Sequence, residues 1–568
     1  MALSRPSRSI DLDGKLRTAT FLSGTIGPHG SRSCDYFAID SCEFLQALAR
    51  IPPTRTGRRG TKNVNEAVPV REEYELLNLD EVRIDPAWAL RVPASLALRK
   101  SVLPLSSLDG VVQVACLNLD DASTLQTVER YVEHPLNPLL AERESLRRAL
   151  TRIFGAVSIP GAISGAPMRL RVRDGRANDG DEGSVALSDE LMQAALMRGA
   201  SDIHIDPSER QVRIRLRVDG ELETYRDLPS DLHHGLISRF KVLGELDIAE
   251  KRAPQDGRFT VSVGATGQRV DVRVATLPTK HGERMTLRLL ALDTSGITLE
   301  GLGMSPHDLD VFEQAVARPH GLVLLTGPTG SGKSTTLYAA LKHRLAAIGG
   351  NFITIEDPIE YEIPGVAQVE VDSVDKVGFR KALRSVLRHD PDVIMIGEIR
   401  DPETADVALK SALTGHLVFS TLHTNSAAGV VTRLIDMGLQ RYLVAATLRL
   451  AVAQRLVRRL CPRCRVARPM TSAEAAVLQR PELAGATVYE PSGCLHCAGR
   501  GVVGRIGLFE LLPMDEALSG AVTRGASESE LIQPLRSDGL RLLHDDGIEK
   551  ALSGETTIQD VLSAVTIW

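Results

Sequence analysis

The sequence predicts a multidomain α/β protein whose largest domain contains a mostly parallel sheet. The chain has 568 residues, and at about 150 residues per domain this length suggests three to four domains. From about residue 305 onward, short apolar runs alternate with helical patterns, the order in which strands and crossover helices build a parallel sheet. One such run, Leu322–Leu325, has the length of a buried strand, and a helical pattern from Ser334 to Ala347 follows it.

Changes in composition divide the rest of the chain. Residues 1–69 are poorly patterned and read as a terminal segment and linker, and 70–154 carry a small α/β pattern. Residues 155–183 are rich in Gly, Pro and Ala, which is typical of a second linker. A helix and repeated strands are expected over 184–300, and the main domain occupies 301–568.

Composition and charge exclude several classes of protein. Hydrophobic residues make up 43% and charged residues 24%, as in ordinary soluble proteins, and no apolar run reaches the roughly 18 residues of a membrane span. No apolar stretch follows the first ten residues, so we expect no secretory signal and a cytoplasmic protein. A net charge of −5 with 4% aromatic residues argues against a basic, base-stacking nucleic-acid surface.

A phosphate-binding loop connects the strand and helix of the main domain. Gly327 to Ser334 match the pattern G-x-x-x-x-G-K-[ST] in full. In such a loop, backbone N–H groups and a helix N-terminus bind phosphates, a lysine reaches the β- and γ-phosphates and a hydroxyl binds Mg²⁺; here these are Lys333 and Ser334. A chance glycine turn before a helix is the alternative. The nucleotide-binding residues predicted in this way are Gly327, Pro328, Thr329, Gly330, Ser331, Gly332, Lys333, Ser334 and Thr335.

Carboxylates follow two other expected strands. The apolar run Val393–Ile396 leads to Gly397-Glu398, a Walker-B pattern in which Glu398 activates the attacking water as general base. Because Gly397 stands where a magnesium-linked Asp is usual, metal support must come from elsewhere. Glu356 and Asp357 end another apolar run and suit magnesium-bound waters, although both residues alternatively cap the turn before the next proline.

Two histidines lie at the two ends of a third apolar run, residues 417–422. In a phosphate-loop domain, His416 and His423 are candidates for sensing the γ-phosphate. A lone histidine is more often a hydrogen-bonded structural group, and the residues themselves do not separate these two interpretations.

Four of the seven cysteines form two Cys-x-x-Cys pairs in the C-terminal part of the chain. An odd number of cysteines in a chain without a signal argues against a disulfide framework, whereas paired knuckles suit tetrahedral Zn²⁺. Four sulfur ligands make a closed and therefore structural site, in a lobe expected over about 458–500; redox disulfides are the alternative. The expected ligands are Cys461, Cys464, Cys494 and Cys497.

Four motifs occur in a fixed order in this chain. They are the phosphate loop, Thr354–Tyr361, Asp390–Asp401 and Thr414–Asn425. Together they resemble the Walker A, Asp box, Walker B and His box of the secretion ATPase superfamily, specifically its GspE/PilB branch, which drives type II secretion and type IV pilus assembly. The resemblance runs from about Val185 to the C-terminus, with a weaker match from about Val70. It implies a RecA-like core after a PAS-like subdomain, and the family keeps Gly-Glu at Gly397-Glu398.

The resemblance also implies a homohexameric ring in which arginines of the 184–300 subdomain approach the nucleotide. A guanidinium neutralises charge that develops on the γ-phosphoryl group, worth about 10³–10⁵ in rate. Because Val212–Val218 alternates apolar and basic residues, an ordinary solvated strand face is the alternative for any single arginine there. The candidates are Arg217, Arg273, Arg284 and Arg288.

The activity that the resemblance implies is ATP hydrolysis with ATP, Mg²⁺ and Zn²⁺ as cofactors. Platform and docking proteins would hold the cytoplasmic motor at the inner membrane. Residues 83–120 resemble half of the family's docking module, but the Arg-Leu-Gly signature of the other half is not visible, so cyclic di-GMP binding is not predicted. We expect no nucleic-acid partner and interpret the arginines between 455 and 468 as a solvated face or a contact for a protein partner. A nucleic-acid translocase or helicase on the same core is the alternative function, and a nucleotide-gated scaffold is a third, which Glu398 disfavours.

Overall fold

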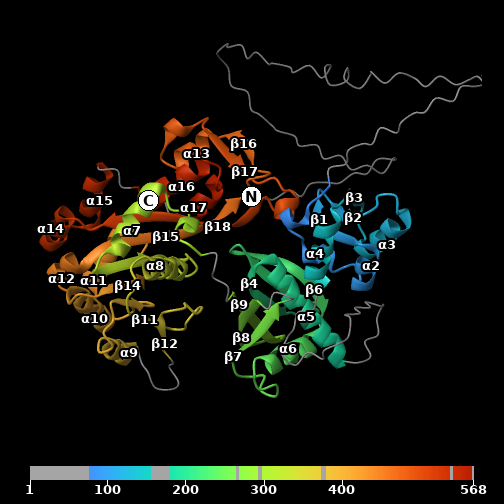
Figure 1. Cartoon of the computed structure of the whole chain (residues 1–568), viewed down its shortest axis with the longest axis horizontal. Helices are drawn as coiled ribbons and strands as arrows, with labels where there is room; N and C mark the ends of the chain where they lie inside the picture. Colours follow the sequence, from blue (N-terminus) through green and yellow to red (C-terminus); the bar gives the residue numbers. More distant parts are fainter. Residues whose placement is uncertain are drawn as a thin grey trace, which may run out of the picture. The chain divides into compact units, whose positions relative to one another are not determined.

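The computed structural model describes residues 76–154, 180–263, 268–291, 297–371, 379–537 and 541–565 (Figure 1). The N-terminal segment expected over 1–69, most of the linker expected over 155–183, and Cys34 and Cys42 lie outside these residues. In the described part of the chain, no helix has the length and apolar content needed to cross a membrane.

The first module is a three-stranded sheet covered by helices. β1 pairs with β2 in antiparallel register, and β2 pairs with β3 in parallel. The Asp121 carboxylate accepts a hydrogen bond from the Thr124 N–H and so begins α3, whose Val128 packs with Leu146 of α4 in the module's core. Its elements are η1 (Leu79–Glu81), α1 (Pro86–Ala89), α2 (Ala94–Lys100), β1 (Val102–Leu108), β2 (Val111–Cys116), α3 (Ala122–Val132), β3 (Leu136–Leu140) and α4 (Arg143–Phe154).

The second subdomain is a six-stranded antiparallel sheet in the order β6-β5-β4-β9-β8-β7. Strand β5 buries Ile214 and Leu216 with Phe240 of α6 in one core, while its alternate residues are arginines on the other face, as the period of two requires. The elements are α5 (Gly180–Arg198), β4 (Ala200–Pro207), β5 (Gln211–Val218), β6 (Glu221–Pro229), α6 (Leu232–Leu243), β7 (Gln255–Val263), β8 (Gln268–Thr279) and β9 (Gly282–Ala291).

The main domain is built on a seven-stranded sheet in the order β12-β11-β13-β14-β10-β15-β18. All neighbouring strands are parallel except the edge pair β15 and β18, so the expected α/β fold with a mostly parallel sheet is confirmed. The elements up to β15 are η2 (Glu300–Leu302), α7 (Pro306–Ala317), β10 (Gly321–Thr326), α8 (Lys333–Ala347), β11 (Phe352–Glu356), β12 (Ala367–Glu370), α9 (Phe379–Val386), β13 (Val393–Ile396), α10 (Pro402–Leu413), β14 (Leu417–Leu422), α11 (Ala428–Asp436), α12 (Arg441–Thr447) and β15 (Leu448–Leu460).

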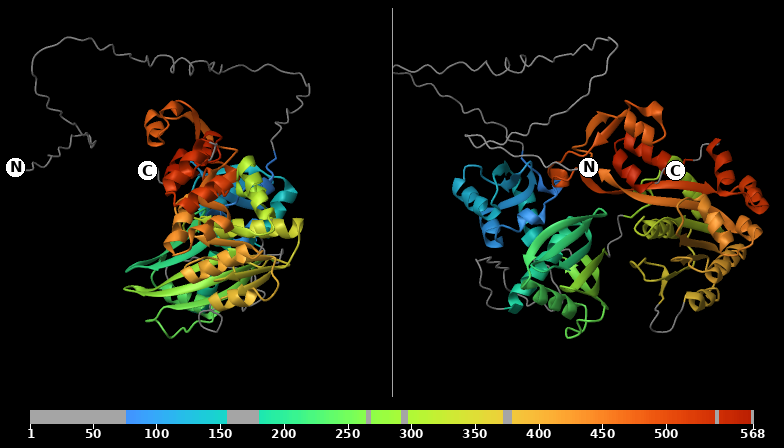
Figure 2. Two further views of the ribbon diagram at one scale, coloured as in Figure 1. Left: turned by 90° about the vertical axis from the view of Figure 1, so that its left-hand side faces the viewer. Right: turned by 180° about the vertical axis from the view of Figure 1, so that it is seen from behind.

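A small lobe lies in sequence between the two long antiparallel strands β15 and β18, which are labelled in Figure 1 and belong to the orange part of the chain seen from behind in the right-hand view of Figure 2. The lobe contains a two-stranded sheet, and four helices follow β18. These elements are β16 (Val466–Pro469), α13 (Ser472–Val477), η3 (Pro481–Leu483), β17 (Thr487–Glu490), η4 (Leu495–Cys497), β18 (Val502–Pro513), α14 (Glu516–Arg524), α15 (Glu528–Ser537), α16 (Leu543–Leu552) and α17 (Ile558–Ala564).

Two apolar cores cover the two faces of the seven-stranded sheet. Leu322 and Leu324 of β10 pack in the core that includes α9 to α12, whereas Val323 and Leu325 pack in the core that includes α7 and α8. Strands covered on both faces are apolar throughout, which explains their unbroken apolar runs. Because β10, β11, β13 and β14 run in parallel, the loops that follow them leave from one edge of the sheet. Those four loops carry the four motifs.

Candidate nucleotide site

The phosphate loop leaves β10 and enters α8 through three glycines at positive φ, of which Gly330 is the middle one. Gly327 and Gly332 have φ angles of 148° and 89°, a region that side chains with a Cβ rarely adopt. A Cβ on Gly327 would also lie 2.5 Å from the Gln454 carbonyl oxygen on β15. The glycines therefore let the loop pass close to β15 and present its N–H groups at the start of α8.

Lys333 is buried at the first position of α8. Its Nζ donates to the carbonyl oxygens of Gly327 at 2.7 Å and Pro328 at 3.0 Å. Burial lowers the pKa of Lys333 to about 8, Glu398 acts to raise it, and Arg455 acts to lower it further. The ammonium is thus held by neutral acceptors of the loop itself, next to the position where phosphates bind such loops.

Glu398 follows β13, and two basic side chains contact its carboxylate. The Arg400 guanidinium pairs with one oxygen, and His423 Nε2 lies 3.5 Å from the other. Arg400 also lies 3.7 Å from Asp357. The structure therefore brings together Asp357, Glu398 and His423, one residue from each of the Asp box, Walker B and His box. Arg400 joins them, and sequence reasoning did not single it out.

The two neighbouring acids of the Asp box lie in different environments. Glu356 is 3% exposed, and its carboxylate accepts hydrogen bonds from the Tyr338 hydroxyl, Thr354 Oγ1 at 2.6 Å and Gln368 Nε2 at 3.0 Å. Asp357, by contrast, is exposed and faces Arg400. Of the two acids predicted to support the metal shell, the structure places Asp357 beside Arg400 and holds Glu356 with donors of its own, so the role of Glu356 stays a prediction.

His416 does not lie with His423. It precedes β14, and its Nδ1 contacts the Ser411 carbonyl oxygen at 3.0 Å, whereas His423 follows the strand. Six strand residues span about 20 Å, so the two histidines lie at opposite edges of the sheet. The structure therefore does not bring the two histidines together, and the predicted link of His416 to the γ-phosphate stays a prediction.

Most candidate arginines of the second subdomain pair with aspartates of their own sheet. Arg284 lies 2.7 Å from Asp206. Arg217 and Arg288 lie 3.8 Å and 2.9 Å from Asp202. Arg273 is different, because its Nη2 donates to the Ile359 carbonyl oxygen at 3.1 Å and so reaches the Asp box segment of the main domain.

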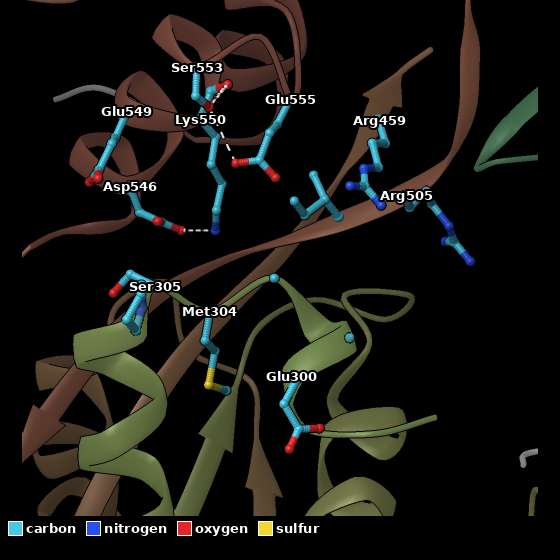
Figure 3. Close-up of a pocket in the computed structure, with 14 residues that line it drawn as sticks. Glu300, Met304, Ser305, Arg459, Arg505, Asp546, Glu549, Lys550, Ser553 and Glu555 are labelled. Carbon is cyan, nitrogen blue, oxygen red and sulfur yellow. Dashed lines mark hydrogen bonds and ion pairs between the residues drawn. The ribbon is translucent and has the colours of Figure 1, made fainter. Parts of the chain in front are cut away.

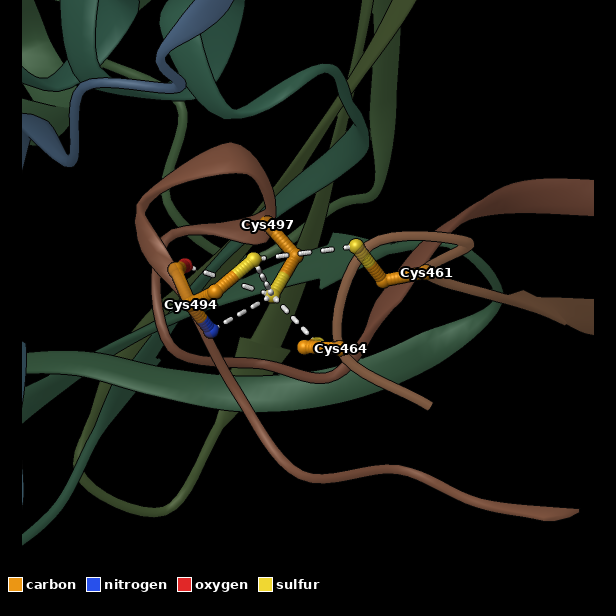
Figure 4. A group of neighbouring side chains, drawn as sticks. All are labelled: Cys461, Cys464, Cys494 and Cys497. Carbon is orange, nitrogen blue, oxygen red and sulfur yellow. Dashed lines mark hydrogen bonds between the residues drawn. The ribbon is translucent and has the colours of Figure 1, made fainter. Parts of the chain in front are cut away.

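The four cysteines of the lobe lie together, as the spacing predicts (Figure 4). Their Sγ atoms lie within 4.8 Å of one another, and the Cys461–Cys494, Cys464–Cys497 and Cys494–Cys497 pairs are each 3.8 Å apart. A tetrahedron with Zn–S bonds of about 2.3 Å has S···S edges of about 3.8 Å. The donor set and its geometry therefore fit one zinc ion.

Backbone N–H groups donate to two of the four cysteine sulfurs. Cys494 and Gly501 donate to Cys497 Sγ at 3.2 and 3.1 Å, and Gly493 donates to Cys464 Sγ at 3.3 Å. Burial acts to raise the pKa of the Cys497 thiol, but the hydrogen bonds from Cys494 and Gly501 lower it below its usual value. Burial raises the pKa of the Cys461 thiol and raises that of Cys464 to about 12. Of these three thiols, Cys497 is the one whose metal-binding thiolate form the backbone donors favour.

A cavity of about 400 Å³ lies elsewhere in the main domain (Figure 3). It is lined by the segment around Met304, by Arg459 and Arg505 of the long strands, and by α16, where Lys550 pairs with Asp546 at 2.5 Å. None of the predicted nucleotide-binding residues lines it. This cavity is therefore separate from the phosphate loop, which lies at the carboxyl edge of the sheet.

Two family models match the chain. The model described as Type II/IV secretion system protein matches residues 177–563, and the MshEN domain model matches residues 72–158.

Several curated proteins are similar over long stretches. Type II secretion system protein E of Klebsiella pneumoniae is 49% identical over 386 residues, 68% of this chain and 76% of that protein. Type II secretion system protein E of Pseudomonas aeruginosa is 38% identical over 496 residues, 85% of this chain and 98% of that protein. Type IV pilus assembly ATPase PilB of Thermus thermophilus is 38% identical over 528 residues, 90% of this chain and 58% of that protein. Among solved structures, the pilus retraction motor PilT with bound ADP is 28% identical with a TM-score of 0.47, covering 66% of this chain and 96% of that one.

Proposed function

The chain belongs to the type II/IV secretion system protein family, and from this premise we propose that it is an ATP-hydrolysing motor of a type II secretion system or a type IV pilus assembly machine. The resemblance inferred from the four motifs is confirmed by the family match. One observation carries the proposal: a complete phosphate loop with a buried lysine opens at the same sheet edge as Glu398. The similarity to a type II secretion system protein E, which covers 98% of that protein, supports a role in such a machine.

In the proposed reaction, Glu398 accepts the proton of a water whose oxygen attacks the γ-phosphorus, while the bond between that phosphorus and the bridging oxygen of ADP breaks. Lys333 exchanges the loop carbonyls for phosphate oxygens and neutralises their charge. The Ser334 hydroxyl and Asp357 would hold Mg²⁺, which supplies charge neutralisation when bound. Arg400 and His423 contact Glu398 in this structure, so we assign them the role of holding this carboxylate until a nucleotide is bound.

The arginines are proposed to act in a ring of six copies of the chain. Arg273 already contacts the Asp box segment within one chain, which favours it as the residue that links the two ATPase subdomains. Arg217 and Arg284 remain proposals for contacts with a nucleotide held by a neighbouring subunit. Their aspartate partners would have to be exchanged for phosphate.

The tetracysteine lobe is proposed to hold structural Zn²⁺. Four sulfur ligands leave no open position for substrate, and binding contributes about 10–16 kcal/mol to the folding of zinc-finger peptides. We further propose that residues 70–154 form a docking module, and that platform proteins hold the motor on the cytoplasmic side of the inner membrane. The MshEN match supports a separate module in this part of the chain.

The test is Mg-ATP turnover by the Glu398→Gln variant. Loss of a general base lowers turnover about 10²- to 10⁴-fold, while ATP binding should persist because the loop and Lys333 are unchanged. Glu403→Gln is the matched control, because Glu403 is exposed in the first turn of α10 and pairs only with Arg380 among the described residues. Turnover by Glu398→Gln at the wild-type rate would overturn the assignment of the base, and a wild-type protein that neither binds nor hydrolyses ATP would overturn the proposed function.

A further inference from the structure

Arg455 lies against the phosphate loop, although the sequence grouped it with a solvated run of arginines. Strand β15 runs parallel to β10 with Ala453 beside Thr326, so the next two residues of β15 pass the start of the loop. The Arg455 Nη1 atom lies 2.9 Å from the position that a Cβ on Gly327 would occupy. The guanidinium is therefore in contact with the first residue of the loop.

The hydrogen bonds of this guanidinium to described residues go to neutral oxygens. Nη1 donates to the Gln454 carbonyl at 3.0 Å and Nη2 to the Asn425 carbonyl at 3.1 Å. Among the described residues, no carboxylate forms an ion pair with Arg455. The negative charge of the buried Glu510 acts to raise the pKa of Arg455. The two carboxylate oxygens of Glu510, however, accept hydrogen bonds from the N–H groups of Ala427 at 2.7 Å and Leu543 at 3.3 Å.

A half-buried cation without a counter-ion is costly, since burial disfavours the charged form. Burial accordingly lowers the pKa of Arg455. Such a group gains most from an anion that arrives next to it, and a guanidinium offers a planar set of donors that matches phosphate oxygens. The electrostatics of this position therefore favour a phosphate.

A second group points to the same place. Ser331 is 3% exposed, its Oγ has no hydrogen-bond partner among the described residues, and it lies 2.8 Å from the same Cβ position on Gly327. A buried hydroxyl is normally hydrogen-bonded. A buried hydroxyl without a partner and a guanidinium without a counter-ion, both next to Gly327 at the start of the phosphate loop, indicate a polar ligand at this point.

We propose that Arg455 is a second cationic residue of the phosphate site, which binds the terminal phosphate of ATP from the β15 side and so distinguishes ATP from ADP. This inference rests on the proposed ATPase function. Arg455 also holds Asn425, two residues after His423. When ATP is bound, the Arg455 guanidinium exchanges the Asn425 carbonyl for the terminal phosphate, and the loop that carries the His box is released. ADP lacks this phosphate and leaves the contact in place.

The experiment compares Mg-ATP and Mg-ADP affinities of the full chain by calorimetric titration. Arg455→Gln should weaken ATP binding about 10- to 100-fold, the range for a hydrogen bond to a charged group, and change ADP binding by less than about threefold. Arg455→Lys keeps a charge at the site and should recover part of the ATP affinity. Arg459→Gln, an exposed residue of the same strand, is the matched control and should leave both affinities unchanged.

Four results would overturn the assignment. The first is an unchanged ATP affinity in Arg455→Gln, and the second is an equal loss of ATP and ADP affinity, which a merely structural role would give. The third is a lysine variant that binds ATP no better than the glutamine variant does. The fourth is a wild-type chain that binds neither nucleotide. The last result also sinks the proposed function, whereas the first three leave it standing. If Arg455→Gln does not fold, the ATP-to-ADP affinity ratio of Arg455→Lys decides the question, because an unchanged ratio contradicts the proposal.

Discussion

The hydroxyl of Tyr338 ties the helix of the phosphate loop to the Asp box, and its removal has an expected cost that can be worked out. Tyr338 on α8 is fully buried and donates to Glu356, a carboxylate that is 3% exposed and has two other donors. A hydrogen bond to a charged group contributes about 1.5–3 kcal/mol. In a domain of this size about 1 kcal/mol shifts Tm by about 2–4 °C. Tyr338→Phe should therefore lower Tm by roughly 3–12 °C.

The neighbouring tyrosine provides the control. The rings of Tyr338 and Tyr361 pack edge to face with centroids 4.2 Å apart, and no residue that the structure describes forms a hydrogen bond with the buried Tyr361 hydroxyl. Tyr361→Phe removes the same atom but no hydrogen bond, so its Tm should stay unchanged or rise slightly. Thermal unfolding followed by intrinsic fluorescence, with urea midpoints as a second measure, compares the two variants directly. Equal losses in both variants, or no loss in Tyr338→Phe, would refute the reasoning.

Two further predictions concern protons and zinc. Because the pKa of Lys333 is lowered to about 8, the apo chain loses this proton as the pH rises through 8, and bound phosphates restore it. ATP binding at pH 8.5 should therefore take up protons and weaken as the pH rises further; calorimetry in buffers of different ionisation enthalpy measures the uptake, and an uptake of zero contradicts the assignment. For the tetracysteine lobe, metal analysis should find one zinc per chain, lost in Cys494→Ser and kept in Cys116→Ser, whose buried thiol lies outside the cluster. Equal zinc content in the two variants would contradict the proposed zinc site.

Features with a local signature could be predicted from the sequence. The phosphate loop, the buried parallel strands and the cysteine quartet each combine a residue pattern with a geometry that few alternatives share. The parallel sheet followed from the alternation of strands and helices, and with it the expectation that motifs after β10, β11, β13 and β14 meet at one edge. These inferences needed only neighbours in sequence and the rules of sheet topology.

Residues whose role depends on distant partners were missed or misplaced. Glu356 is the last residue of a strand and Asp357 the first after it, and successive side chains of a strand point to opposite sides. The two acids therefore face different neighbours, Tyr338 of α8 for Glu356 and Arg400 for Asp357. His416 and His423 bracket one strand, whose length puts them at opposite ends. Arg455 looked solvated because its contacts, Gly327 and Asn425, lie far away in the sequence.

The central claim is that a triphosphate lies with its terminal group between Lys333 and Glu398. A structure of the Glu398→Gln variant with Mg-ATP tests it most directly, because the variant should bind without turnover. We expect the Lys333 ammonium to leave the Gly327 and Pro328 carbonyls for phosphate oxygens, with one water between the γ-phosphate and the side chain at 398. ATP bound away from the loop, or a γ-phosphate too far from residue 398 for a single water to bridge, would contradict the account.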